Sequence, residues 1–343
     1  IKNSNNLIES NQIYNNGYGS TSSQEAGICI RSGDSNTIRN NTIYKNKNDG
    51  ITVMSGNQSN VFTQNAIYQN GNIGIDLGTG SNSLGDGITV NDANDADTGG
   101  NNLLNFAMIK QALSVNGKLV IQGCAPSGST IELYEADVSP TSVSQVAAGS
   151  NKFGKTQDYG EGERYLTTFV EGVGEDTVTT PVDCATLTDA DGNSAVGMSP
   201  FQWTLTMPSN VLIDDKLTVT ATNASNTSEF SPVVSLQLYQ DRGDASASYG
   251  DAAHTINAAV YLGTTLPDMD ASSVASTGAD GDDISGIDDE DSVSTLPSLY
   301  TSSTGTSVNV KVLNSTGNKA WLVGWIDFNK NGVFDSNEAA TIP

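Results

Sequence analysis

The sequence predicts an all-β protein that begins as a parallel β-helix and continues through further β-rich domains. Three observations carry this prediction: an asparagine-rich phrase repeated three times near the start, stretches of alternating apolar residues in the middle, and acidic, glycine-rich loops. At 343 residues the chain is long enough for two or three domains. We expect β-helix coils with an acidic closing loop over 1–106, an immunoglobulin-like β-sandwich over 107–238, and a partial acidic, calcium-binding β module over 239–343.

The repeated phrase occupies residues 4–16, 35–46 and 59–70, and a second element follows each copy as GICI, GITV and GIDL. A fixed period in this range, with strand-forming residues and asparagine at the corners, predicts a solenoid. The aligned columns are Asn6/Asn36/Asn60, Asn11/Asn41/Asn65, Ile13/Ile43/Ile67, Tyr14/Tyr44/Tyr68 and Asn16/Asn46/Asn70. The alternative is three independent asparagine-rich turns in an ordinary sandwich, and five columns in register count against it.

Apolar residues at positions two and four of each second element have the period of a strand and should point inward. These residues are Ile28, Ile30, Ile51, Val53, Ile75 and Leu77. Coils stacked ~4.8 Å apart would join them into one buried row. We expect the asparagines to adopt left-handed backbone at strand ends and to bond to the same amide one coil away. The pattern resembles the right-handed parallel β-helix repeats of bacterial extracellular proteins and carbohydrate-active enzymes.

The solenoid ends in an acidic loop that could hold a cation. Asp92, Asn94, Asp95 and Asp97 lie within six positions and are followed by glycines. Such oxygen ligands suit a hard cation such as Ca²⁺, and a solvated turn is the alternative. GIDLG followed by NDANDADTGGNNLLNF resembles the closing segment of β-helix regions in large bacterial surface proteins, which implies that a small β-sandwich follows.

The middle of the chain shows half-buried antiparallel strands, for example KLTVTATN at 216–223, and no helical periods, which predicts a sandwich. Trp203 is expected in its core. Cys124 and Cys184 are 60 positions apart in this region, and a disulfide between them would stabilise the fold by about 4 kcal/mol on the chain-entropy model. Three reduced thiols are the alternative, and an extracellular setting favours the bridge. Cys29 should face outward from its strand.

The last part looks like the front of the GEVED domain of bacterial secreted and surface proteins. Its opening, DRGDASASYGDAAHTINAAVYLG, departs from the family at Arg242 and Ser246. Residues 327–338, DFNKNGVFDSNE, fit the twelve-residue calcium loop at every specified position, with a hairpin turn as the alternative. The predicted ligands are Asp327, Asn329, Asn331, Val333, Asp335 and Glu338. A weaker second candidate is the run Asp282, Asp283, Asp288, Asp289 and Asp291.

Composition restricts the function. The chain has 39 acidic and 15 basic residues, and its net charge of −24 without a basic cluster argues against nucleic acid and anionic membranes as partners. No apolar run is long enough to span a membrane as a helix. No basic pair or stacked carboxylate pair occurs at the outward positions of the repeated strand, which are Cys29, Thr52 and Asp76, followed by Arg31, Met54 and Gly78. The single His254 has no catalytic partners in sequence.

We therefore expect a protein without enzymatic activity that is structural or adhesive, stabilised by Ca²⁺ and located on the bacterial cell surface. Because Ile1 lies close to the first repeat, the coil edge there should be covered by more chain or by a partner, so head-to-tail assembly into a filament or stalk is a further expectation. Expected partners are copies of itself, neighbouring surface proteins, or glycans. The alternative is a β-helix that binds or cleaves polysaccharides.

Overall fold

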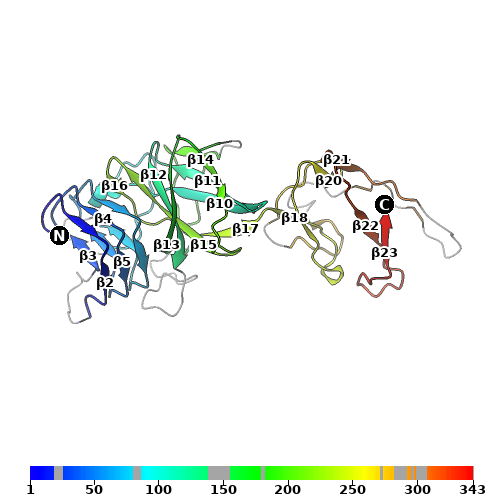
Figure 1. The fold of residues 1–343 in the computed structure, drawn as a ribbon, viewed down its shortest axis with the longest axis horizontal. Coiled ribbons are helices and arrows are strands. Elements are labelled where there is room, and N and C mark those ends of the chain that lie inside the picture. Colours follow the sequence, from blue (N-terminus) through cyan, green and yellow to red (C-terminus); the bar gives the residue numbers. More distant parts are fainter. Residues whose placement is uncertain are drawn as a thin grey trace. The chain divides into compact units, whose positions relative to one another are not determined.

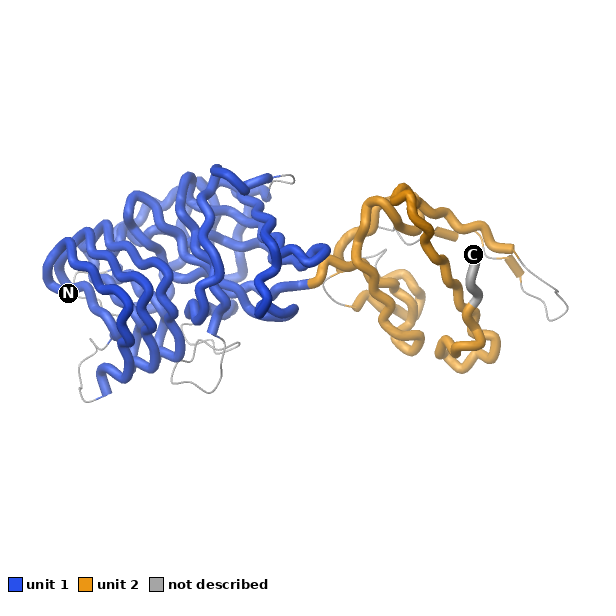
Figure 2. The backbone as a smooth tube through the Cα atoms, in the orientation of Figure 1, with its two compact units in different colours: residues 1–237 blue, residues 238–343 orange. Residues whose placement is uncertain are grey.

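The computed structural model describes residues 1–18, 26–79, 86–137, 155–178, 182–270, 273–281, 292–293, 295, 297–298 and 307–342. The regular secondary structure of the described residues is almost entirely β-strand, and the chain forms two compact units, residues 1–237 and 238–343 (Figures 1 and 2). The first unit contains both the predicted β-helix and the region predicted as a sandwich. The predicted boundary at 106 therefore lies inside a single compact unit.

In the first part of unit 1 the described residues form nine short strands. They stack as three parallel sheets, visible as successive coils at the N-terminal end of Figure 1. The sheets consist of β1 (Leu7–Glu9), β4 (Thr37–Arg39) and β7 (Val61–Thr63); β2 (Gln12–Tyr14), β5 (Thr42–Tyr44) and β8 (Ala66–Tyr68); and β3 (Ile28–Ile30), β6 (Ile51–Val53) and β9 (Ile75–Leu77). The register follows the sequence alignment, since Ile13 pairs with Ile43 and Ile43 with Ile67. The parallel β-helix is thus confirmed.

The interior of the coils is an aliphatic row supplied by all three sheets. The six residues predicted to point inward from β3, β6 and β9 are all buried, and Ile38, Ile43 and Ile67 join them from the other sheets. No single coil could exclude water from these side chains, so the stacking itself creates the core.

Asparagine ladders run along the corners, as predicted. Asn46 donates from both its backbone N and its Nδ2 to Oδ1 of Asn70, at 3.0 and 2.8 Å. The prediction of left-handed backbone at these asparagines is wrong by one position, because the positive φ belongs to the preceding residue, for example Lys45 (52°) and Gln69 (55°). The preceding residue makes the turn, which leaves the asparagine free to point inward and bond along the stack.

Antiparallel strands form the second part of unit 1. They are β10 (Met108–Val115), β11 (Lys118–Ala125), β12 (Thr130–Asp137), β13 (Glu161–Val170), β14 (Ser199–Thr206), β15 (Lys216–Asn223), β16 (Asn226–Thr227) and β17 (Val234–Leu238), preceded by a short 3₁₀ turn at Gly100–Leu103. The strand order is β13-β12-β15-β17-β10-β11-β14, with β16 beside β15. We refer to residues 107–238 as the antiparallel sheet region.

A single hydrophobic core is shared by strands from both ends of this strand order. Leu119 and Ile121 from β11 pack in the same cluster as Leu133 and Val219 from β12 and β15. Trp203 is only 1% exposed at the centre of this core, as predicted. The alternation of apolar residues along these strands is explained by this shared interior.

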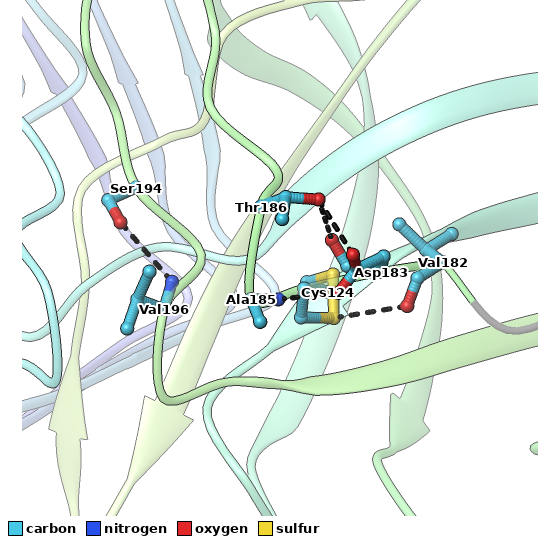
Figure 3. The surroundings of a disulfide bond; sticks show 8 residues. Cys124, Val182, Asp183, Ala185, Thr186, Ser194 and Val196 are labelled. Carbon is cyan, nitrogen blue, oxygen red and sulfur yellow. Dashed lines mark hydrogen bonds between the residues drawn. A yellow bond between two sulfur atoms is a disulfide. The ribbon is translucent and has the colours of Figure 1, made fainter.

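A disulfide joins Cys124 at the end of β11 to Cys184 in a loop, with their Cα atoms 5.9 Å apart (Figure 3). These are the two cysteines that the sequence favoured for a bridge. Beside the bridge, the Asp183 carboxylate accepts hydrogen bonds from Ala185 N and Thr186 Oγ1, at 3.1 and 2.8 Å. Cys29 is free and half-buried, between the buried Ile28 and Ile30.

The antiparallel sheet region closes the last coil of the β-helix with carboxylates. Glu161 accepts from Asn70 N (2.9 Å) and Asn70 Nδ2 (2.7 Å), so it takes the place of the asparagine that a further coil would supply. Glu132 accepts from Gln64 N (2.8 Å), and Asp137 accepts from Gln69 N (2.9 Å). These bonds satisfy donors that would otherwise be left unpaired at the end of the stack.

The described residues of unit 2 form three two-stranded antiparallel pairs. Its elements are β18 (Gln240–Arg242), β19 (Ala253–Thr255), β20 (Val260–Leu262), β21 (Val312–Asn314), β22 (Leu322–Trp325) and β23 (Ala339–Ile342), with a 3₁₀ turn at Ala247–Tyr249. Few of its described side chains are buried, and Ile256 is one of them. The acidic run from Asp282 to Asp291 lies outside the described residues.

Candidate functional site

The acidic loop after the β-helix brings together the three carboxylates predicted to bind Ca²⁺. One oxygen from each of Asp92, Asp95 and Asp97 lies within 4.8 Å of the other two. This separation is compatible with a single ion, because Ca²⁺ takes oxygen ligands at about 2.3–2.6 Å from its centre. The sequence placed these residues in one loop, and the structure adds that their side chains converge.

Backbone conformation and hydrogen bonds fix this loop. Asp95 has a left-handed backbone (φ 52°), and its Oδ1 accepts a hydrogen bond from Asn105 N at 2.8 Å. Both oxygens of Asp92 accept from Ala96 N, at 3.1 and 3.0 Å. Oδ1 of Asp97 is shielded from solvent and has no hydrogen-bond partner. A shielded, unpartnered oxygen is what a bound cation would satisfy.

The electrostatics of the loop favour a positive charge. Desolvation, followed by the charges of Asp92 and Asp95, raises the pKa of Asp97 to about 6. Desolvation and the charge of Asp92 likewise raise the pKa of Asp95. A bound divalent ion would lower the pKa of both Asp95 and Asp97, because its charge offsets the mutual repulsion of the three carboxylates.

The same loop links the β-helix to the antiparallel sheet region. Asn94 N donates to Val196 O at 2.9 Å, and Asn91 N donates to Asn193 Oδ1, also at 2.9 Å. Order in the loop is therefore coupled to the contact between the two parts of unit 1.

The second predicted set of ligands lies in unit 2, between β22 and β23. Asn329 Nδ2 and Asn331 Nδ2 both donate to Asp335 Oδ2, at 3.1 and 3.0 Å. Glu338 Oε1 accepts from Phe328 N at 2.9 Å, and Glu338 itself is buried. The six predicted residues therefore belong to one closed turn, and five of their side chains are drawn into its hydrogen bonds.

The first residue of this turn is held in its ionised form. Although desolvation opposes it, hydrogen bonds from Gly332 N and Tyr249 OH lower the pKa of Asp327. Gly332 has φ 79°, the conformation that its predicted role at the sharp bend requires. Val333 N donates to Asn331 Oδ1 at 2.9 Å.

Sequence reasoning missed a third group of acidic side chains, on the outer face of the β3–β6–β9 sheet. Thr52 and Asp76 were predicted to face outward, and the structure buries both. Asp49 and Glu229 are also buried, and Glu229 accepts from Leu77 N at 2.9 Å. No local signal marks this group, because Glu229 lies 152 residues from its partner in β9.

A row of tyrosines runs along the outside of β2, β5 and β8. The rings of Tyr14 and Tyr44 stack with centroids 5.0 Å apart, and those of Tyr44 and Tyr68 with centroids 5.1 Å apart. The stacking follows from the parallel register, which places equivalent residues one coil above another.

Comparison with known proteins supports the class of fold. Residues 1–131 match the family model described as a right handed beta helix region. This match covers β1 to β9 and extends into the antiparallel sheet region. The first part of the chain is accordingly similar to right-handed β-helices in sequence as well as in strand arrangement. A search of curated proteins finds no match. Among the described residues no helix has the length and apolar character needed to cross a membrane.

Proposed function

We propose that this chain is a structural or adhesive part of a bacterial cell-surface protein, without enzymatic activity, in which Ca²⁺ stiffens rigid β modules. The observation that carries the proposal is the convergence of Asp92, Asp95 and Asp97 in the loop that joins the β-helix to the antiparallel sheet region. An ion there would stabilise the contact between the two parts without performing chemistry.

Other features support an extracellular structural role. The disulfide suits an oxidising compartment, and the net charge of −24 suits a surface on which cations screen acidic groups. Burial of Thr52 and Asp76 removes two of the outward positions on which an extended glycan could be bound and cleaved. The turn at 327–338 offers a second calcium site of the same kind in unit 2.

Unfolding of the whole chain with and without CaCl₂ tests the proposal. After treatment with EDTA, added Ca²⁺ should raise the midpoint of the unfolding transition. A free Ca²⁺ concentration of 100 times the dissociation constant stabilises the folded state by about 2.7 kcal/mol. Replacement of Asp95 and Asp97 by Asn should reduce this gain. Glu175→Gln, an exposed carboxylate in a turn, is the matched control and should keep it. Equal stability of the wild-type protein in EDTA and in CaCl₂ would contradict the proposal.

The proposal extends to self-association as a filament or stalk subunit. Negative-stain electron microscopy of the native material, with and without EDTA, addresses it directly. Regular filaments that fray on chelation are the expected result. Isolated particles at high protein concentration, with no change on addition of EDTA, would count against head-to-tail assembly.

One observation favours a second candidate function, the binding of polysaccharide. Aromatic side chains are common contacts for sugars, and the row of Tyr14, Tyr44 and Tyr68 lies on the surface of the coils, with Tyr14 exposed. A glycan array with the wild-type chain and with Tyr44→Ala would detect such binding. If the wild-type chain binds a glycan on the array and Tyr44→Ala does not, the result would favour glycan recognition over a purely structural role.

A further inference from the structure

Two buried carboxylates lie next to each other on the outer face of the β3–β6–β9 sheet. Thr52 in β6 and Asp76 in β9 are paired in register, so their side chains leave the sheet on the same face, one coil apart. Thr52 Oγ1 donates a hydrogen bond to Asp49 Oδ2 at 3.1 Å. Thr52 therefore brings the carboxylate of Asp49 beside that of Asp76. Asp49 and Asp76 are 3% and 0% exposed.

Each of these carboxylates has one oxygen in a hydrogen bond and one without a partner. Asp76 Oδ2 accepts from Gly87 N at 3.1 Å. Oδ1 of Asp49 and Oδ1 of Asp76 are both buried, and neither has a hydrogen-bond partner. Leaving one such oxygen buried and unpaired costs about 1–3 kcal/mol, and more when the group is charged. A cation bound between the two oxygens would remove this cost.

The surroundings of the pair are acidic. Glu229 is buried and directs both oxygens to backbone donors, Leu77 N and Thr89 N, each at 2.9 Å. Asp86 accepts from Thr79 N at 3.1 Å. Burial, and after it the charge of Asp49, raises the pKa of Asp76 well above its ordinary value, and Glu229 and Asp86 add to the effect. Thr52, the Ile73 backbone and the Asn72 side chain form hydrogen bonds that favour the ionised form of Asp49, and Gly87 does so for Asp76, but none of these neighbours carries a positive charge.

We propose that Asp49 and Asp76 bind a calcium ion between the outer face of β9 and the segment at Gly87 that covers it. Their two Oδ1 atoms would be ligands, and their two negative charges would balance the ion. Ca²⁺ is the preferred cation because it accepts oxygens in irregular geometry, whereas Mg²⁺ demands an octahedron and retains its water. Thr52 would act as the residue that positions Asp49. This site shares no ligand with the acidic loop at 92–97 and does not depend on the function proposed above.

A shared proton is the competing explanation for the pair. Two neighbouring carboxyl groups can share one proton in place of an ion. Neither Oδ1 atom has a hydrogen-bond partner, so both explanations fit the pair, and the number of calcium ions bound per chain separates them because a protonated pair binds none.

Counting bound ions in the full-length protein tests the inference. The chain is stripped with EDTA, dialysed first against a calcium-free buffer to remove the chelator and then against dilute CaCl₂, and its bound calcium is measured per chain. Asp49→Asn and Asp76→Asn should each bind one ion fewer than the wild-type protein, and Glu175→Gln should bind the same number. The variant with Asn at both 95 and 97 should keep the ion at Asp76. An unchanged count in both Asp49→Asn and Asp76→Asn overturns the inference.

Two further measurements separate a lost site from a lost fold. Thr52→Val keeps the shape of the side chain but removes the hydroxyl that orients Asp49, and such supporting contacts are worth about 10–100-fold in metal affinity. We expect weaker calcium binding with an unchanged circular dichroism spectrum. In the wild-type protein, Ca²⁺ should slow hydrogen exchange at the amides of Ile75–Leu77 and at Gly87. Exchange there that is identical with and without Ca²⁺ overturns the inference without any variant.

The two calcium proposals can fail separately. If the variant with Asn at 95 and 97 keeps the full calcium-dependent gain in stability while Asp76→Asn loses it, the acidic loop is not the stiffening site and the buried site stands. If Asp76→Asn keeps the wild-type calcium count and slowed exchange, the buried site falls and the function proposed for the acidic loop is unaffected.

Discussion

Replacing Glu161 should reveal how much the end of the asparagine ladder contributes to stability. Inside the β-helix, Asn70 Oδ1 accepts from both the backbone N and the Nδ2 of Asn46. At the last coil, Glu161 does the same for Asn70 through its two carboxylate oxygens. Both residues are completely buried, so water does not replace the bonds that the change removes.

The expected magnitude follows from those two bonds. Glu161→Ala would leave the buried Asn70 N without its acceptor, at about 1–3 kcal/mol, and would remove one bond of about 1 kcal/mol from Asn70 Nδ2, which keeps the carbonyls of Ile43 and Tyr68. The free energy of unfolding should therefore fall by about 2–4 kcal/mol. Glu161→Gln keeps one oxygen, which can accept both donors as the asparagine oxygen does one coil earlier. We therefore expect Glu161→Gln to lower the free energy of unfolding by less than half as much as Glu161→Ala.

Guanidinium denaturation followed by Trp203 fluorescence measures this difference. Trp203 is buried in unit 1, and Phe in place of Trp321 and Trp325 leaves it as the only tryptophan of the chain. Glu163→Ala, an exposed carboxylate on the same strand, is the matched control and should stay within about 0.5 kcal/mol of the wild-type protein. The reasoning is refuted if Glu161→Ala costs no more than this control, or if Gln costs as much as Ala.

Three further predictions concern the core, the disulfide and a buried acid. Ile43→Ala should destabilise unit 1 by about 2–5 kcal/mol in the same denaturation assay, because the site is fully buried and stacked on both sides; a smaller loss would mean that the coils close over the cavity. Serine at both Cys124 and Cys184 should cost about 4 kcal/mol, measured by thermal unfolding, and an unchanged midpoint would show that the bridge adds nothing. Burial, opposed by hydrogen bonds from the backbone, raises the pKa of Glu229 from 4.5 to about 8. The folded state then binds this proton more tightly than the unfolded state, so in EDTA the free energy of unfolding should fall as the pH rises from 4.5 towards 8. Glu229→Gln should flatten that slope, and an equally steep slope in the variant would assign it to other groups.

Much of the β-helix was predictable because its contacts repeat. A residue in one coil pairs with the residue at the equivalent place in the next, so the separations of 30 and 24 in sequence become hydrogen bonds of the same separations in the structure. Ile43 is buried and Asn46 bonds to Asn70 for this reason. The position of the left-handed residue was misassigned, because both residues of the corner belong to the same repeat and the alignment does not separate them.

The two candidate calcium loops were also predictable, since each is a short run of oxygen-bearing residues. Asp92, Asp95 and Asp97 lie within six positions, and Asp327 and Glu338 begin and end one twelve-residue turn. Ligands so close in sequence are constrained to remain close in space, whatever the rest of the fold does. Convergence of the three carboxylates to within 4.8 Å needed the structure, because it depends on the backbone angles within the loop.

The sequence by itself determined the coil, its register and the loops whose ligands are neighbours along the chain. Only the tertiary structure decided how the last coil is closed and what is buried on the outside of the coils. Glu161 reaches Asn70 across 91 residues, and Glu229 reaches Leu77 across 152. Each of these contacts occurs once, between parts of the chain that share no repeat, so the repeat pattern does not predict them. Their partners are set by the packing of the antiparallel sheet region on the β-helix. Asp76, at an outward position of its strand, is fully buried and bonds to Gly87 in the segment that follows the coils.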